Sequence, residues 1–386
     1  MTEQLPPKTL RVLGFMTGTS LDAVDMAVIE TDGHDILGFG PAGEMKLDAD
    51  TRAIIEDAIE DAFDWERDEE EPESFDDARM AVADAHLAAS LGFMAMNGVK
   101  NLDLVGVHGQ TVLHEAPTPE LEGRTVQLID AVAVADGLGL PVVHDFRTAD
   151  VAAGGQGAPL APIYHAALVR WSGIKGPVAV LNLGGVGNIT FIAADGSLEA
   201  FDTGPANGMV DLVVQSRSRK RMDENGVLAR AGTVDDAVLA EYLGHPYFAT
   251  SGPKSLDRFD FSLDGVEHLK LEDAVATLTA FAADAVALGV ARCSAQPEQV
   301  IVCGGGRHNP ALMEAISERL SMPVKTAEEH GWRGDSIEAE AFAYLAARSH
   351  LGLPISFPGT TGVKGPMTGG RTASPGDEPG MEPMED

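Results

Sequence analysis

The sequence predicts an α/β protein with two domains. Its 386 residues are more than a single hydrophobic core usually serves. Short apolar runs typical of strands alternate with longer helical patterns, as they do in α/β folds. The order strand, glycine-rich turn, strand opens the chain at 10–30 and recurs at 178–193. We interpret this recurrence as a structural duplication.

The individual elements follow from the same patterns. The helix expected at 74–97 follows an acidic loop at 64–73, and Ser74 is its predicted N-cap. The other expected helices lie at 51–63, 310–320 and 335–350. Strands are expected at 10–16, 24–30, 104–107, 141–143, 178–183, 189–193, 197–201 and 300–303.

The order of these elements sets the expected domain limits. Residues 1–165 form the first domain, and residues 166–334 form the second. The last helix and the residues after it, 335–370, return to the first domain. Residues 371–386 are rich in Pro, Gly and acidic side chains, so this tail is predicted to be disordered.

The charge excludes some partners. Asp and Glu total 60 and Lys and Arg total 27, so the net charge is −33. Nucleic acid and anionic membrane both require a basic surface, and neither is an expected partner. The loop at 64–73 and the tail carry part of the excess, either as a solvated acidic surface or as an interaction segment. A bound phosphate would depend on backbone amides, helix N-termini and a metal ion.

Cysteine content and hydropathy favour the cytoplasm. Cys293 and Cys303 are the two cysteines, too few for a disulfide framework. The first nine residues contain no signal-peptide core. The most apolar windows, 126–143 and 274–291, are interrupted by aspartates, so no transmembrane helix is expected.

Three glycine-rich turns follow expected strands, and each can present backbone N–H groups to phosphate. One such turn is usually only a turn, whereas three in one chain favour a nucleotide site. The chain has no Gly-Lys dipeptide, which excludes a P-loop, and no evident Rossmann fingerprint. Two opposed phosphate hairpins with a third glycine loop are typical of the actin/hexokinase fold, a duplicated ribonuclease H-like fold with an inter-domain cleft. The three turns comprise Gly18, Thr19, Ser20, Leu21 and Asp22; Gly184, Gly185, Val186, Gly187 and Asn188; and Gly304, Gly305 and Gly306.

Asp202 is a candidate general base. It follows the strand expected at 197–201 and precedes Gly204 and Pro205. A carboxylate held at a strand end suits proton abstraction during phosphoryl transfer. The alternative is an Asx-turn that caps the loop, and the local sequence alone favours it.

Other polar residues carry weaker signals. Asp22 and Asp25 follow the first glycine turn and are either turn residues or ligands of Mg²⁺ through water. Glu338 lies near the start of the last helix, where the helix dipole favours a carboxylate in any case. His108 is either a sugar contact or a hydrogen-bonded structural residue, and no zinc-type spacing occurs. Lys254 and Lys364 are loop lysines, which are usually only solvated.

Taken together and in order, the motifs resemble those of the anhydro-N-acetylmuramic acid kinase family. The resemblance runs from residue 10 to residue 370. The motifs are GFMTGTSLDAVD (14–25), HGQTV (108–112), DFR (145–147), GGQGAPL (154–160), NLGGVGNI (182–189), FDTGP (201–205) with Asn207, CGGG (303–306) with HNP (308–310), GD (334–335), EA (338–339) and TGV (361–363).

The resemblance implies a function. Such enzymes use ATP and water to open the 1,6-anhydro ring of anhydro-N-acetylmuramic acid and to phosphorylate the freed 6-oxygen, in cell-wall recycling. Asp202 matches the general base and Glu338 a second acidic residue. The implied cofactors are ATP and Mg²⁺, with Asp22 as a water-mediated metal ligand, and the implied assembly is a homodimer. The expected ATP-binding residues are Gly18, Thr19, Ser20, Leu21, Asp22, Ala23, Val24, Asp25, Gly184, Gly185, Asn188, Gly304, Gly305 and Gly306, and the expected substrate-binding residues are His108, Gln110, Thr111, Gln156 and Asn207.

Two positions depart from the family pattern. Ala23 stands where the family usually has Gly, and it would strain the loop if that position requires a positive φ. Gly208 stands where a larger apolar residue is common. Two other functions stay open, namely a kinase of an ordinary hexose or amino sugar, and a sugar-binding regulator without catalysis.

Overall fold

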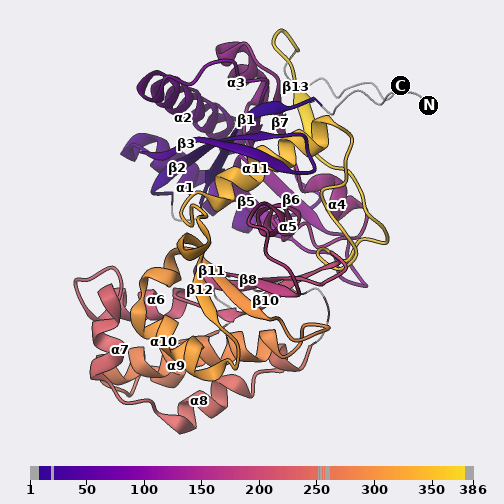
Figure 1. Cartoon of the computed structure of the whole chain (residues 1–386). Coiled ribbons are helices and arrows are strands. Elements are labelled where there is room, and N and C mark those ends of the chain that lie inside the picture. The colour runs from indigo at the N-terminus through magenta and orange to yellow at the C-terminus, as the bar shows by residue number, and fades with distance from the viewer. Residues whose placement is uncertain are drawn as a thin grey trace. The chain divides into compact units, whose positions relative to one another are not determined.

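The computed structural model describes residues 8–18, 21–250, 252, 254, 256 and 261–378 (Figure 1). The chain divides into two compact units. Unit 1 comprises Met1–Trp171 and Ser336–Asp386, and unit 2 comprises Ser172–Asp335. Unit 1 is therefore built from both ends of the chain, with unit 2 inserted between them in sequence.

Unit 1 contains a six-stranded sheet in the order β13-β7-β4-β1-β2-β3. Strands β1, β2 and β3, the first three along the chain, form an antiparallel meander. On the other side of β1, strands β4 and β7 run parallel to it. The strands are β1 (Leu10–Thr17), β2 (Ala23–Thr31), β3 (Ile36–Lys46), β4 (Leu104–Val107), β7 (Val142–His144) and β13 (Arg371–Ala373), and a separate hairpin pairs β5 (Gln110–Glu115) with β6 (Arg124–Leu128). The helices are α1 (Ala49–Asp64), α2 (Ser74–Asn97), α3 (Ala131–Leu138), α4 (Thr148–Ala152), α5 (Pro162–Trp171) and α11 (Ile337–His350).

Unit 2 repeats this topology with five strands in the order β10-β9-β8-β11-β12. Strands β8, β9 and β10 again form an antiparallel meander. On the other side of β8, strands β11 and β12 run parallel to it. The predicted duplication is confirmed, and each unit has the ribonuclease H-like α/β order of the actin/hexokinase type. The strands are β8 (Val178–Leu183), β9 (Val186–Ile192), β10 (Leu198–Pro205), β11 (Gln299–Cys303) and β12 (Val324–Thr326), and the helices are α6 (Gly208–Arg217), α7 (Val227–Ala231), α8 (Asp236–Leu243), α9 (Leu271–Val290) and α10 (Pro310–Arg319).

Two local predictions were wrong. Ser74 makes no cap bond in α2; its hydroxyl instead donates to Asp61 over 2.6 Å. The segment after Gly370 does not begin disordered, because β13 pairs with β7 and Arg371 forms an ion pair with Asp145 at 3.2 Å. Residues 379–386 of the tail lie outside the described residues.

Helix α11 packs across β1, β2 and β4, where Figure 1 shows it in yellow against the indigo strands. Gly14 of β1 and Gly106 of β4 are paired in register beneath it. A Cβ at Gly14 would lie 2.0 Å from the carbonyl oxygen of Ala339, and one at Gly106 would lie 2.4 Å from that of Phe342. The glycine pair therefore allows the helix backbone to approach the sheet directly.

Helix α9 is the core helix of unit 2 and packs against β9 and β10. Among the described residues, it is the helix whose length and composition would suffice to cross a membrane. However, 78% of its most apolar window is buried inside the protein. Packing within unit 2 accounts for its apolar character.

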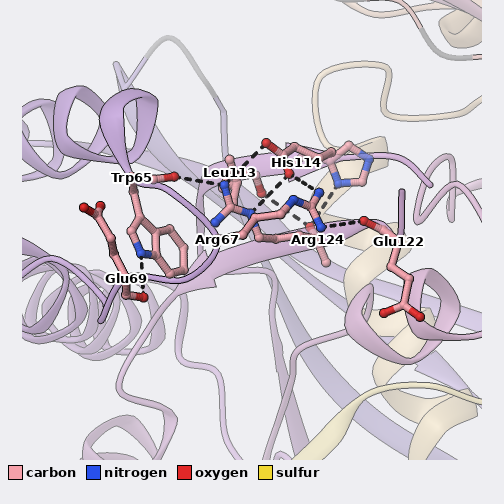
Figure 2. Close-up of polar contacts among 9 residues, drawn as sticks. Trp65, Arg67, Glu69, Leu113, His114, Glu122 and Arg124 are labelled. Carbon is pink, nitrogen blue, oxygen red and sulfur yellow. Dashed lines mark hydrogen bonds and ion pairs between the residues drawn. The ribbon is translucent and has the colours of Figure 1, made fainter. Parts of the chain in front are cut away.

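Arginines fasten the acidic loop between α1 and α2 to the β5–β6 hairpin (Figure 2). Arg124 donates to the Trp65 carbonyl over 3.1 Å, and its guanidinium lies 4.5 Å from the centre of the Trp65 ring. Arg67 donates to the Glu122 carbonyl over 2.7 Å and forms an ion pair with Glu115. The start of the loop is thus ordered against the hairpin.

Candidate active site

The β8–β9 hairpin of unit 2 turns at Gly184 and Gly185. Neither residue has a positive φ. A Cβ built on either would have its nearest neighbour at 3.5 Å or 3.9 Å, which is ordinary contact. The fold itself does not require glycine here, so these glycines are suited to the close approach of a ligand. The turn is fixed from behind, because the amides of Asn207 and Gly208 donate to the carbonyls of Gly184 and Gly185 over 3.1 and 3.0 Å.

The loop after β11 contains Gly304, Gly305 and Gly306, which differ in what they require. Gly304 has φ +75°, and a Cβ there would lie 2.2 Å from Oδ1 of Asn182. A Cβ on Gly306 would lie 2.7 Å from Nδ2 of Asn207. No atom lies within 4 Å of a Cβ on Gly305. Gly304 and Gly306 therefore pack the loop against the end of β8 and the start of α6, and Gly305 is left open.

Arg307 supports this loop, and the sequence reasoning did not identify it. Its side chain is buried, and Nη1 donates to the Gly304 carbonyl over 2.9 Å. It forms ion pairs with Glu328 and Asp335, each at 2.8 Å, and these carboxylates raise its pKa against the effect of burial. The sequence feature that could have pointed to Arg307 is its place directly after three glycines.

Three polar residues form a row across the unit 2 sheet. Asn182 of β8 is opposite Asn188 of β9, and Asn188 is opposite Asp202 of β10. Residues opposite each other on adjacent strands present their side chains to the same face. All three are half-buried. Asn188, expected in a turn, lies in a strand because the turn has only two residues.

Asp202 lies inside β10 rather than after it. The pairing with β9 shifts between Asp202 and Gly204, so the carboxylate is placed at a β-bulge. Its Oδ2 accepts a hydrogen bond from the Leu256 amide over 2.8 Å. This partner is 54 residues away in sequence, so the contact is not the local Asx-turn considered above.

The pKa of Asp202 is raised to about 7. Burial is the main cause, because it disfavours the charged carboxylate. The hydrogen bond from Leu256 and the positive charge of Lys254 oppose this rise. A carboxyl group with this pKa is present in both ionisation states near neutral pH, as a general base requires.

The β1–β2 turn of unit 1 is built differently from its counterpart. Leu21 has φ +52° and its amide donates to the Gly18 carbonyl over 3.1 Å. Ala23 does not have a positive φ and begins β2, so alanine causes no backbone strain there. Val24 is buried in the unit 1 core, which leaves only its backbone for a ligand. Thr19 and Ser20, expected to contact ATP, lie outside the described residues.

The acidic residues near this turn differ in exposure. Asp22 is exposed, and its carbonyl accepts from the Leu47 amide over 3.2 Å. Asp25 is half-buried within β2, opposite Met16 of β1. In the described part of the chain, no three His, Cys, Asp or Glu side chains gather as a metal site would require. Any ion near Asp22 would therefore keep most of its water ligands.

His108 is buried at the end of β4 with both ring nitrogens engaged. Nε2 accepts from Nε of Arg147 over 2.9 Å, so Nδ1 carries the proton and donates to the Gly109 carbonyl over 2.9 Å. Burial, followed by the charge of Arg147, lowers the pKa of His108 well below 6.5. The ring is thus neutral and supports Arg147. This geometry favours the structural alternative for His108.

Gln110, at the start of β5, is buried and donates from Nε2 to the Thr111 carbonyl over 3.3 Å. Its Oε1 is buried without a hydrogen-bond partner in the described structure. Such an atom is costly unless a ligand or water reaches it. Thr111 and Gln156 are half-buried, and the backbone N–H of Gln156 donates to the Thr361 carbonyl over 2.7 Å.

Arg147 and Asp150 connect His108, Gly157 and Thr361 into one cluster in unit 1, and the sequence reasoning assigned neither of them a role. Arg147 donates to the Gly157 carbonyl over 2.7 Å. Burial lowers its pKa to about 10, while the charges of Glu338 and Asp150 oppose this. Asp150 is buried and accepts from the Gly157 amide and the Thr361 hydroxyl over 2.7 and 2.6 Å. The DFR motif at 145–147 and the GGQG motif at 154–157 were the sequence features that could have pointed to these two residues.

The two remaining predicted residues begin helices. Glu338 is exposed in the first turn of α11, and its charge acts on Arg147. Asn207 is the N-cap of α6, although its side chain makes no cap bond. A Cβ on the next residue, Gly208, would lie 2.8 Å from the Gly185 carbonyl. Glycine at 208 thus lets α6 contact the β8–β9 turn.

Comparison with known proteins identifies the family. The family model described as anhydro-N-acetylmuramic acid kinase matches residues 10–374. The anhydro-N-acetylmuramic acid kinase of Caulobacter vibrioides is 62% identical over 364 residues, which are 94% of this chain and 98% of that protein. The one from Phenylobacterium zucineum is 60% identical over 368 residues, covering 95% and 100%.

Solved structures are more distant. A ROK family glucokinase from Streptomyces griseus in complex with glucose and AMPPNP aligns at TM-score 0.39 and 15% identity, covering 88% of this chain and 99% of its own. The assignment therefore depends on the family model and the sequence relatives. The chain belongs to the anhydro-N-acetylmuramic acid kinase family and is a phosphotransferase.

Proposed function

We propose that this protein uses ATP and water to open the 1,6-anhydro ring of 1,6-anhydro-N-acetylmuramic acid, giving N-acetylmuramic acid 6-phosphate in peptidoglycan recycling. The observation that carries the proposal is Asp202, a half-buried carboxyl at a β-bulge whose pKa is about 7. A base of this pKa can take a proton from water at neutral pH.

The proposed reaction couples cleavage to phosphoryl transfer. Asp202 accepts a proton from water as the water oxygen bonds to the anomeric carbon. The bond from that carbon to the 6-oxygen breaks, and its electron pair stays on the oxygen. This oxygen attacks the γ-phosphorus of ATP and ADP leaves. The sugar gains the hydroxyl of the water at the anomeric carbon and one phosphoryl group at the 6-oxygen, and Asp202 then releases the proton to solvent.

The glycine turns of unit 2 are the proposed nucleotide contacts. Gly184, Gly185 and Gly305 have ordinary φ values and room for a Cβ, so the free protein gives no reason for glycine at these sites. Approach of a phosphate or a base to the backbone would give one. The turn at 18–25 is the corresponding contact in unit 1. The backbone N–H groups of these turns would provide the local positive potential that a phosphate needs on a protein of net charge −33.

The unit 1 cluster is the proposed sugar site. Gln110 has a buried Oε1 without a partner, which a sugar hydroxyl can satisfy by donating to it. Thr111 follows Gln110 in β5 and, with Gln156 and Asn207, stays a predicted sugar contact. His108 would act through Arg147 rather than by touching the sugar, because both its nitrogens are engaged.

Glu338 and Asp22 are proposed to play supporting roles. Glu338 would stabilise positive charge that develops at the anomeric carbon. Asp22 is the proposed water-mediated ligand of Mg²⁺, which would neutralise charge on the transferring phosphoryl group. We also propose that the protein is cytoplasmic, because its two cysteines are free. The family resemblance is the basis for proposing a homodimer.

An ATP-consumption assay tests the proposal. The purified protein is given Mg²⁺, ATP and one of three sugars: 1,6-anhydro-N-acetylmuramic acid, N-acetylmuramic acid or glucose. We expect turnover of the anhydro sugar, with a product heavier by one phosphoryl group and one water.

Each other outcome supports a different function. Turnover of only an open sugar would make this an ordinary sugar kinase. Binding of a sugar without turnover of any would indicate a regulator and would contradict the assignment of Asp202 as a base.

A further inference from the structure

One segment of unit 2 holds Asp202 through three contacts. The Asp202 amide donates to the Lys254 carbonyl over 3.0 Å, as in an added strand. Its carboxylate accepts from the Leu256 amide over 2.8 Å. Its carbonyl accepts from the Tyr247 hydroxyl over 2.6 Å. The backbone and the side chain of Asp202 are therefore both oriented by Tyr247, Lys254 and Leu256.

The Lys254 ammonium is itself held in place. Nζ donates to the Tyr247 carbonyl over 3.0 Å and lies 3.8 Å from the centre of the Tyr247 ring. Both contacts favour a cation at this position. Tyr247 thus binds Lys254 with its ring and carbonyl, and Asp202 with its hydroxyl.

The charged surroundings of Asp202 are simple in the described part of unit 2. Lys254 is the cation that acts on it, and Tyr247 is the neighbouring phenol. On the sheet, β9 presents the neutral Asn188 opposite it. Burial, followed by the charge of Arg292 just after α9, lowers the pKa of Lys254 to about 8, while the charge of Asp202 opposes this. Lys254 is therefore still largely protonated at the pH where Asp202 ionises.

We propose that Lys254 is a positioning residue for the Asp202 base: its carbonyl orients the strand, and its ammonium, held against Tyr247, favours the ionised form of the carboxylate for proton abstraction. This inference rests on the proposed function of Asp202. It assigns a task to a lysine that local sequence would leave as a solvated loop residue.

The test is the pH profile of kcat/KM for the anhydro sugar at saturating ATP. Lys254→Met removes the charge, so the pKa of Asp202 should rise and the acid limb should move up by about one pH unit, or tenfold at pH 6. Lys254→Arg keeps the charge and should restore the limb. Lys175→Met, at an exposed lysine of the same unit, is the matched control and should behave as wild type.

Two further variants keep the inference open to refutation. If Lys254→Met does not fold, Lys254→Gln takes its place. Tyr247→Phe retains the ring beneath the ammonium but loses the hydrogen bond to Asp202, so it should lower kcat with little shift of the limb. A limb that stays in place in the neutral variants, while wild type turns over, would overturn the role of Lys254 alone. Absence of wild-type turnover would overturn the proposed function as well.

Discussion

The two units share one strand order, yet each places a cation beside a different titratable group. In unit 1, Arg147 donates to His108 at the end of β4. In unit 2, Lys254 acts on Asp202 in β10. Burial disfavours the charged form of both groups. The cation adds to burial for the histidine and opposes burial for the carboxylate.

The outcome is a different use for each pair. Both influences lower the pKa of His108, so the imidazole stays neutral and serves as a fixed hydrogen-bond acceptor. The two influences oppose each other at Asp202, and its pKa settles at about 7. The same α/β frame thus carries a static support in unit 1 and a group suited to proton transfer in unit 2.

The largest expected effect is in unit 2. Asp202→Asn should lower kcat about 10³-fold or more, because it removes the base while keeping the shape and the Leu256 hydrogen bond. ATP affinity should change little. Steady-state kinetics and nucleotide titration check this, with circular dichroism as the folding control. If Asp202→Asn keeps the kcat of wild type, Asp202 is not the base and unit 2 does not differ from unit 1 in this respect.

The corresponding change in unit 1 should affect binding and stability more than chemistry. Arg147→Met leaves the His108 nitrogen and the Gly157 carbonyl without their donor, so the free energy of unfolding should fall by about 1–3 kcal/mol. We expect a higher KM for the sugar and a smaller loss of kcat than in Asp202→Asn. Denaturant titration and kinetics measure these changes. Arg147→Lys should recover only part of the loss, since lysine lacks the planar fork.

The glycines of one loop provide a matched pair. Gly305→Ala should leave stability unchanged because its Cβ meets open space, but it should raise the KM for ATP about tenfold if the nucleotide approaches there. Gly304→Ala should destabilise unit 2, because its Cβ would meet Asn182 and its φ is +75°. Thermal unfolding and ATP titration separate the two. Equal ATP affinity in Gly305→Ala and wild type would remove this loop from the nucleotide site.

The smallest effect is a pair of opposite pH dependences. Asp202 has a higher pKa folded than unfolded, so it contributes stability at low pH that is lost as pH rises from 4 towards 7. His108 has a lower pKa folded, so its contribution is lost as pH falls below 6.5. Relative to wild type, Asp202→Asn and His108→Gln should change the slope of unfolding free energy against pH with opposite signs, each within its own window. Slopes of the same sign would contradict the comparison.

Sequence patterns predicted the duplication and the glycine turns and selected Asp202 as a candidate base. They did not identify the residues that support these features. The glycine turns are local, so a few adjacent residues signal them. Arg147 and His108 are 39 residues apart, and Asp202 and Leu256 are 54 apart. No local pattern links residues at such separations. Leu21 could not be recognised as the positive-φ residue of the first turn, since leucine rarely adopts that conformation.

The sequence by itself determined the family, the alternation of strands and helices and the repeated strand–turn–strand order, because these depend on local propensity and on motifs read in order. Only the tertiary structure decided that Gly14 and Gly106 pair beneath α11, that both nitrogens of His108 are engaged, and that the Asp202 amide donates to the Lys254 carbonyl. Burial and the distance between charges arise when remote segments pack together. Since these two quantities set each pKa, the division between support and base appears only in the folded chain.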